Sequence, residues 1–174
     1  VALSLTASKY EKTAGARMAK YEIDRAAFDD GRLQDNDIVL FRYADVLLMV
    51  AECENEVNGG PTTLAYQCIN AVRQRAGIAV LAGLNQEDFR TAVKNERAME
   101  LCFEMTRRFD LIRWGEFKAN MNALVARAKN GSNWTLGPSN VYTYFQVSDT
   151  YNYFPIPSNE MSVNKAIKDN NPGW

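Results

Sequence analysis

The chain has 174 residues, of which 47% are apolar and 24% charged, and its formal net charge is −1. It is long enough for one globular domain with a buried core, and its charge balance gives no reason to expect binding to nucleic acid or to an anionic membrane surface. It contains no histidine, which excludes a Ser/His/Asp triad, a Cys/His pair and any metal site that uses histidine.

The first predicted helix begins near Arg42, after a polar segment, residues 1–36, that is predicted to be irregular. Apolar side chains then recur at helical spacing along one face, namely Tyr43, Val46, Leu47, Val50 and Val57. A second row of small and apolar groups comprises Ala44, Leu48 and Ala51. A helix that is apolar on two faces is expected to pack between neighbours, and Asn58-Gly59-Gly60 should end it.

Two further helices are predicted next. The first runs from about Thr62 to Ala76, with Pro61 suited to its first turn and Gly77 to its C-terminal cap. Its apolar positions are Ala65, Cys68, Ile69, Val72 and Ala76. Because the turn before it is short, it should lie antiparallel to the first helix. The second begins at Asn85, a good N-cap, and its apolar positions are Phe89, Ala92, Val93, Leu101, Cys102 and Met105.

A fourth helix is predicted after Gly115, and its apolar positions are Met121, Leu124, Val125 and Ala128. The chain then changes character. Residues 141–145 have strand propensity, residues 151–157 are rich in aromatic residues and proline, and Ser158 can start one more short helix. No apolar run approaches the ~20 residues that span a bilayer.

These elements predict a mainly α fold of antiparallel, tetratricopeptide-like helical hairpins, with an irregular, aromatic-rich C-terminal tail and little β structure. We expect residues 1–174 to form a single domain. It would consist of an irregular opening segment (1–36), a helical core (37–130) and a tail of loops and short strands (131–174).

The three cysteines, Cys53, Cys68 and Cys102, form no CxxC pair, and an odd count excludes a complete set of internal disulfides. Each lies in the apolar phase of a predicted helix, so buried free thiols are expected. A bridge between Cys53 and Cys68 on adjacent helices is left open.

Three segments, in this order along the chain, carry a family resemblance. The first is Arg42-Tyr43-Ala44-Asp45-Val46-Leu47-Leu48-Met49-Val50-Ala51-Glu52. The second joins Ile69-Asn70-x-Val72-Arg73-x-Arg75-Ala76-Gly77 to Glu96-Arg97-x-x-Glu100-Leu101-x-Phe103-Glu104 and Arg107-Arg108-Phe109-Asp110-Leu111-x-Arg113-Trp114-Gly115. The third is Phe154-Pro155-Ile156-Pro157-x-x-Glu160, then Asn164 and Asn171-Pro172-Gly173. Together they resemble the C-terminal portion of the SusD/RagB family.

The resemblance implies a non-enzymatic, cofactor-free lipoprotein on the outer membrane of a Gram-negative bacterium, which captures a glycan beside a TonB-dependent transporter. No leader segment is visible at Val1, and the resemblance places the lipid anchor upstream in a longer chain. Three positions depart from the family pattern: Asp45 stands for glutamate, Met105 for glycine and Trp174 for tyrosine. No specific binding residue is carried over from the family.

Glu96, Glu100 and Glu104 share one face of the third helix. A row of carboxylates would suit a metal site or a glycosidase, but helical di-iron sites need a Glu-x-x-His motif, and glycosidases place two carboxylates across a cleft. We therefore predict no catalytic residue and no metal. We interpret the glutamates as a structural ion-pair network whose cations are Arg73, Arg75, Arg107 and Arg108.

The candidate ligand contacts are the loop aromatics Trp134, Tyr142 and Tyr144. Sugars present flat C–H faces edged by hydroxyl groups, so they stack on aromatic rings while polar side chains bond the rim. We interpret Phe145 and Phe154 as packing residues that cover the helices.

The function predicted is therefore a binding module for an oligosaccharide, without a nucleic-acid partner. Two alternatives are a peptide-binding member of the family and a helical protein-interaction scaffold, because stacked helical hairpins offer concave faces to other proteins. A hydrolase is the least favoured, since neither a histidine nor a facing pair of carboxylates is predicted.

Overall fold

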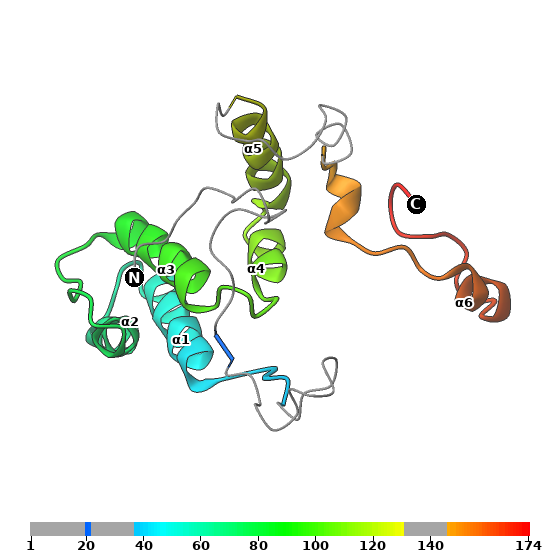
Figure 1. Cartoon of the computed structure of the whole chain (residues 1–174). Helices are drawn as coiled ribbons and strands as arrows, with labels where there is room; N and C mark the ends of the chain where they lie inside the picture. The colour runs from blue at the N-terminus through cyan, green and yellow to red at the C-terminus, as the bar shows by residue number, and fades with distance from the viewer. Residues whose placement is uncertain (1–19, 22–36, 131–145) are drawn as a thin grey trace, which may run out of the picture. The chain divides into compact units, whose positions relative to one another are not determined.

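The structure is a computed structural model that describes residues 20–21, 37–130 and 146–174 (Figure 1). Its helices are α1 (Tyr43–Val57), α2 (Thr63–Arg75), α3 (Gln86–Glu100), α4 (Arg107–Arg113), α5 (Phe117–Asn130), the 3-10 helix η3 (Asp149–Asn152) and α6 (Ser158–Val163). No strand occurs within these ranges. The predicted mainly helical fold class is confirmed, whereas the strand predicted at 141–145 lies outside the described residues.

The chain divides into two compact units, Val1–Met105 and Thr106–Trp174. The first contains α1 to α3, and the second contains α4 to α6 with η3. The predicted single domain, with its subdivisions at residues 36 and 130, remains a prediction. Among the helices in the described ranges, none has the length and apolar character that a membrane crossing requires.

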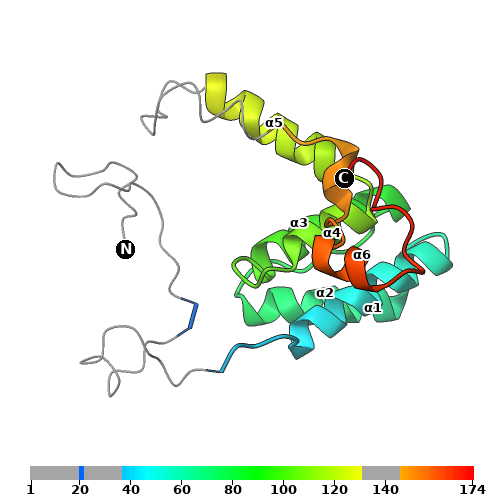
Figure 2. The same ribbon diagram turned by 90° about the vertical axis from the view of Figure 1, so that its right-hand side faces the viewer.

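The core of the first unit lies among its three helices. α1 contacts both α2 and α3, and Figure 2 shows the three lying alongside one another. Phe89 is fully buried at the centre, and the ring of Tyr66 meets it edge-on with centroids 5.0 Å apart. Around it pack the other buried apolar residues, Leu48, Ala51, Ala65, Cys68, Ile69, Val72 and Val93.

The predicted helix ends are set by side chains and glycine. Thr62 accepts a hydrogen bond from the backbone N–H of Ala65 (3.1 Å), and Asn85 accepts one from Asp88 (2.9 Å), so both cap a helix N-terminus. Pro61, predicted inside the second helix, therefore lies just before it. Gly77 has a φ of +72° and follows α2, as expected for a C-terminal cap.

The face of α1 that enters the core differs from the longer apolar row seen in the sequence. Tyr43, Val46 and Val57 are exposed, and Val57 keeps 84% of its surface. The buried face instead consists of Asp45, Leu48, Ala51 and Asn55. The second apolar row predicted Leu48 and Ala51 but not the two polar positions: the Asp45 carboxylate pairs with Arg97, and the Asn55 amide donates to the carbonyl of Gln86.

All three cysteines are free, so the bridge between Cys53 and Cys68 is not formed. Only Cys68 is buried, and Cys53 and Cys102 are exposed, which corrects the expectation of three buried thiols. Cys53 lies on the exposed side of α1, and Cys102 lies just beyond the end of α3. Burial raises the pKa of the Cys68 thiol, helped by the nearby charge of Glu54.

Met105 adopts a left-handed backbone conformation, with a φ of +60°. This conformation costs an L-residue roughly 1–2 kcal/mol and costs glycine almost nothing. We expect Met105→Gly to raise the free energy of unfolding in urea by about 1 kcal/mol, because relief of strain exceeds the entropy that glycine loses on folding.

Met99→Gly is the matched control, since Met99 is also exposed but lies within α3. Glycine inside a helix costs about 1 kcal/mol, so the two variants should shift stability in opposite directions. A loss of stability in both would contradict the strained conformation of Met105.

In the second unit, asparagines and a glycine hold the C-terminal segment. Asn170 makes two hydrogen bonds with the backbone of Ile156, at 2.8 and 3.2 Å. Gly173, with a φ of +90°, passes so close to Thr150 that a Cβ there would clash with the threonine side chain.

Phe154 is 67% exposed, so the prediction that it covers the helices is wrong. Its ring lies 4.4 Å from the guanidinium of Arg108 instead.

Candidate functional site

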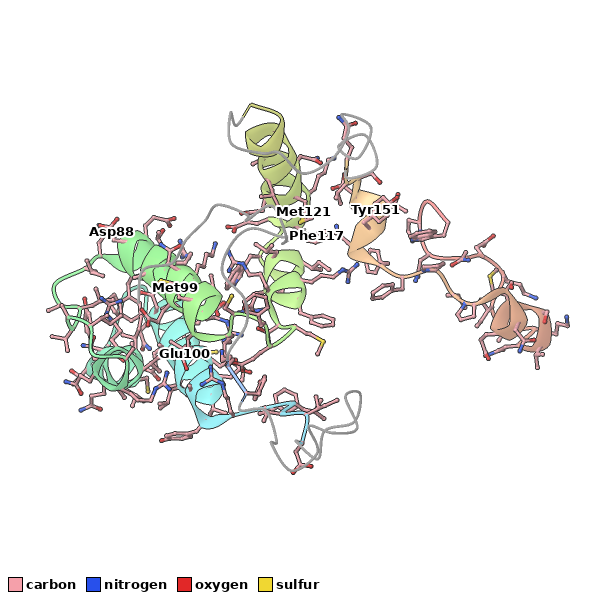
Figure 3. All side chains as sticks on the ribbon, viewed as in Figure 1. Asp88, Met99, Glu100, Phe117, Met121 and Tyr151 are labelled. Atoms are coloured by element: carbon pink, nitrogen blue, oxygen red, sulfur yellow. The ribbon has the colours of Figure 1, made fainter. Side chains whose placement is uncertain are left out.

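A cluster of charged groups gathers where α3 ends beside the start of α1, and Figure 3 labels Glu100 at this point. Arg42 bonds Glu100 Oε1 at 2.5 Å and Glu104 Oε2 at 2.7 Å. Arg75 reaches Glu100 Oε2 at 2.5 Å, and Lys20 forms an ion pair with Glu104. Arg42 and Lys20 also donate to the backbone carbonyl of Glu100. This carbonyl lies at the C-terminal end of α3, where the helix dipole makes a nearby cation stabilising.

Further ion pairs link the helices of the first unit, among them Arg90 on α3 with Glu56 on α1 at 2.6 Å. Arg73 on α2 bonds Glu96 on α3 at 2.6 Å. Arg97 on α3 bonds Asp45 on α1 at 2.8 Å, and both side chains are over nine-tenths buried. The carboxylates of Glu96, Glu100 and Asp45 each accept from an arginine. These ion pairs join α3 to the segments around it, as expected of a structural scaffold.

The predicted network residues are thus brought together in part. Glu96, Glu100 and Glu104 pair with cations as described, and Arg73 and Arg75 are among the cations. Arg108 donates to the carbonyl of Tyr151 at 2.5 Å and lies over the rings of Phe117 and Phe154. The guanidinium of Arg107 lies 5.5 Å from the centre of the Trp114 ring. That the network is purely structural remains a proposal.

Burial by itself would raise the pKa of Glu104, but hydrogen bonds and charge from Arg42 and Lys20 outweigh it, so the pKa lies below the ordinary 4.5. Hydrogen bonding by Arg90 likewise lowers the pKa of Glu56. A carboxylate whose pKa is lower in the folded state stabilises the fold above its unfolded pKa, and this stabilisation is lost as the pH falls through the folded value.

We therefore expect the free energy of unfolding to fall as the pH is lowered below 4.5. In Arg42→Met the pKa of Glu104 should move upward, since its burial stays and its main partner goes, so the acid-side fall should be smaller. Urea unfolding midpoints measured across this pH range test the difference.

Lys118→Met removes an exposed pair with Asp149 (2.8 Å) and serves as control. It should keep the pH dependence of the wild type. Identical acid-side slopes in wild type and Arg42→Met would contradict the proposed coupling between Arg42 and Glu104.

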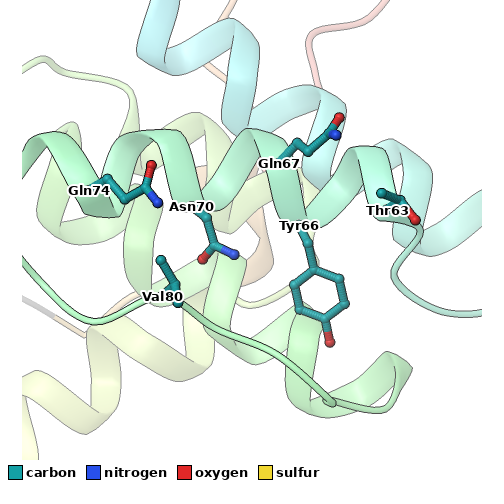
Figure 4. A pocket seen from close by; sticks show the side chains of 6 residues that line it. All are labelled: Thr63, Tyr66, Gln67, Asn70, Gln74 and Val80. Atoms are coloured by element: carbon teal, nitrogen blue, oxygen red, sulfur yellow. The ribbon is translucent and has the colours of Figure 1, made fainter.

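A pocket of ≈ 420 Å³ is formed by α2 together with the loop that follows it. Its lining carries no charged side chain and comprises Thr63, Tyr66, Gln67, Asn70, Gln74 and Val80. Figure 4 shows Tyr66 and Asn70 pointing from α2 toward the loop that carries Val80. We call this pocket the α2 groove.

The wall of the α2 groove is fixed by side chains of α2. Asn70 bonds both backbone groups of Leu81, donating to its carbonyl (3.0 Å) and accepting from its N–H (2.8 Å). Tyr66 accepts from the N–H of Leu84 at 2.7 Å, and Arg73 donates to the carbonyl of Ala79 at 2.7 Å. The loop between α2 and α3 is therefore held at three points.

The predicted ligand contacts Trp134, Tyr142 and Tyr144 lie outside the described residues, so their role stays a prediction. Among the residues that are described, no group of three or more Cys, Asp or Glu side chains is arranged to hold a metal ion.

The α2 groove and two members of the charged cluster, Arg42 and Lys20, were not predicted from the sequence. A signal for the groove exists: the solvent side of α2 carries uncharged Thr63, Gln67 and Gln74 where charged residues are usual. Arg42 offers a signal as well, because it is the first residue of the Arg-Tyr-Ala-Asp segment and immediately precedes α1. Lys20 offers no comparable signal, because it is distant in sequence from the glutamate that it pairs with.

Comparison with known proteins connects this fold to one group. Residues 4–174 match the sequence profile of the SusD family. The SusD-like protein P25 of Formosa agariphila is 43% identical over 137 residues, 76% of this chain and 23% of that protein. The starch-binding protein SusD of Bacteroides thetaiotaomicron is 30% identical over 152 residues, 86% of this chain and 24% of that protein. The chain thus spans about a quarter of the length of these relatives.

Solved structures show the same likeness. A SusD homologue from Bacteroides thetaiotaomicron matches with a TM-score of 0.64 and 38% identity, over 77% of this chain and 26% of its own. Surface glycan-binding protein A from Bacteroides uniformis matches with a TM-score of 0.59 and 30% identity, over 84% of this chain and 30% of its own.

Proposed function

The chain belongs to the SusD family, and we propose that it acts without catalysis in capturing a glycan at the outer cell surface of a Gram-negative bacterium. The observation that carries the proposal is the family match along residues 4–174. One relative is named for starch binding and another for surface glycan binding. Because this chain spans about a quarter of their length, its ligand and partners belong to the proposal.

The contacts of the charged residues support binding over catalysis. General acid–base hydrolysis of a glycosidic bond needs two carboxyl groups that face each other across the substrate. Glu96 and Glu100 instead accept from arginines of α2 and of the segment before α1. Pairing of this kind uses the carboxylate oxygens in contacts between segments of the chain, which suits a rigid scaffold.

We further propose that the protein works beside a TonB-dependent outer-membrane transporter, as a lid over its channel, and that a lipid anchor attaches it to the membrane.

The uncharged α2 groove and the aromatic residues predicted to bind sugar, Trp134, Tyr142 and Tyr144, would supply contacts of the kind that oligosaccharides use. The helices supply rigidity, and ligand capture needs no covalent step.

Isothermal titration calorimetry of the chain against uncharged plant and algal oligosaccharides tests the ligand class. Saturable heat with at least one glycan, with the glycan recovered at unchanged length, is the expected result. Heat with peptides alone would move the protein to a peptide-binding role, and a shortened glycan would establish a hydrolase. Co-purification with a transporter but without ligand affinity would support an interaction scaffold.

A further inference from the structure

We propose that the α2 groove is a contact site for an uncharged sugar unit of the captured glycan. The inference rests on the proposed function and adds to it the place and the ligand class. It is carried by three properties of the groove: a wall that is fixed without ligand, side-chain amides that have no partner among the described residues, and a lining that, within the same part of the chain, carries no charge.

The fixed wall means that binding need not order the loop. Tyr66, Asn70 and Arg73 recur at helical spacing on one side of α2, and each bonds the backbone of the loop between α2 and α3. The Tyr66 ring also meets buried Phe89 at 76° with centroids 5.0 Å apart, so it is held from two directions. A site that is formed before the ligand arrives avoids the entropy cost of ordering it.

The amides of Gln67 and Gln74 supply the unused hydrogen-bonding capacity. Both are exposed and make no hydrogen bond with any residue in the described part of the chain. Each amide offers two N–H donors and one carbonyl acceptor, which matches sugar hydroxyls, since a hydroxyl both donates and accepts. The seven-residue spacing separates them by about 10 Å along the helix, a span suited to linked sugar rings.

The ring of Tyr66 and the side chain of Val80 supply the apolar part of the groove. Figure 4 shows the Tyr66 ring between α2 and the loop, with the amides of Asn70 and Gln74 farther along the same helix. Aromatic surface beside hydrogen-bonding groups fits a pyranose ring, which has C–H faces and a polar rim.

The lining selects against two other ligand classes. A sulfated or carboxylated glycan would bring charge to a groove whose lining has no cation, and an unpaired charge is costly to desolvate. Arg73, which holds the wall of the groove, is already bonded to the carbonyl of Ala79 and paired with Glu96. A peptide that binds by strand addition needs free backbone groups. Here the backbone groups of Leu81 and the N–H of Leu84 are already bonded to Asn70 and Tyr66.

The test is nuclear magnetic resonance of the ¹⁵N-labelled full chain, titrated with maltoheptaose and laminarihexaose as uncharged probes. Oligogalacturonate and a polyalanine peptide serve as charged and peptide probes. With at least one uncharged probe, the side-chain amide signals of Gln67 and Gln74 are expected to shift in a saturable manner. The charged glycan and the peptide should leave them in place.

The variant Gln67→Ala/Gln74→Ala should weaken binding of that glycan about tenfold, the loss expected for two hydrogen bonds. Both positions are exposed on a helix in which alanine is well tolerated, so the fold should be kept. Gln146→Ala, at an exposed glutamine of the second unit, is the matched control and should bind like the wild type.

The outcomes separate the two proposals. If a glycan binds but the shifts lie elsewhere and the double variant keeps its affinity, the groove assignment is overturned while the proposed function stands. If neither uncharged probe binds, the groove assignment is overturned together with glycan capture of this type. Shifts at both glutamines with the peptide alone would overturn the ligand class.

Discussion

Replacement of Phe89 by alanine is expected to lower the free energy of unfolding by about 3–5 kcal/mol, the cost of removing a large aromatic side chain from a packed core. Phe89 is fully buried on α3 and contacts the ring of Tyr66, which in turn bonds the loop after α2. The loss of stability would therefore have two sources: the cavity left in the core, and a less firmly positioned Tyr66, which bonds that loop. Urea unfolding followed by circular dichroism measures it.

Phe109→Ala is the matched control, because Phe109 lies on α4 and is 63% exposed. Its removal should change the free energy of unfolding by less than about 1 kcal/mol. Equal losses in the two variants would show that Phe89 is not the centre of the core. Since Tyr66 lines the α2 groove, Phe89→Leu gives a milder variant in which glycan affinity can also be followed.

The helices of this chain were predictable because their boundaries are encoded locally. Thr62, Asn85 and Gly77 mark helix ends by capping chemistry that acts within a few residues. The inner face of α1 was less accessible to prediction. Its buried residues Asp45 and Asn55 are polar, so a search for apolar periodicity passes over them. Their burial is explained by their tertiary partners, Arg97 and Gln86.

The candidate site was predictable only in part, for a similar reason. Pairing of Arg73 with Glu96 and of Arg75 with Glu100 followed from adjacent helices with complementary faces. Arg42 and Lys20 join the same cluster from segments far away in the sequence, so spacing could not reveal them. The α2 groove depends on how the loop after α2 folds back on that helix, and local pattern carries only the weak signal of its uncharged row.

The second large effect is expected at the buried pair of Asp45 and Arg97. Their side chains retain 8% and 4% of their surface and are joined by a bond of 2.8 Å. Removal of one partner leaves a buried charge whose hydration has been lost and whose main counter-charge is gone. Asp45→Ala should therefore lower the free energy of unfolding by about 3 kcal/mol. Asp149→Ala, which breaks an exposed pair, should cost less than about 1 kcal/mol.

A double variant separates the cost of burying the Arg97 charge without Asp45 from the contribution of the pair itself. In Asp45→Leu/Arg97→Met both charges are replaced by apolar groups, and burial then needs no counter-charge. We expect it to be clearly more stable than Asp45→Ala in urea unfolding, because much of the loss in the single variant comes from keeping the Arg97 charge buried without the Asp45 carboxylate. If the double variant is instead less stable than the single one, the pair contributes more than its desolvation costs. Asp45 would then be an anchor of the α1–α3 contact in its own right, which a smaller loss in Asp45→Glu would corroborate.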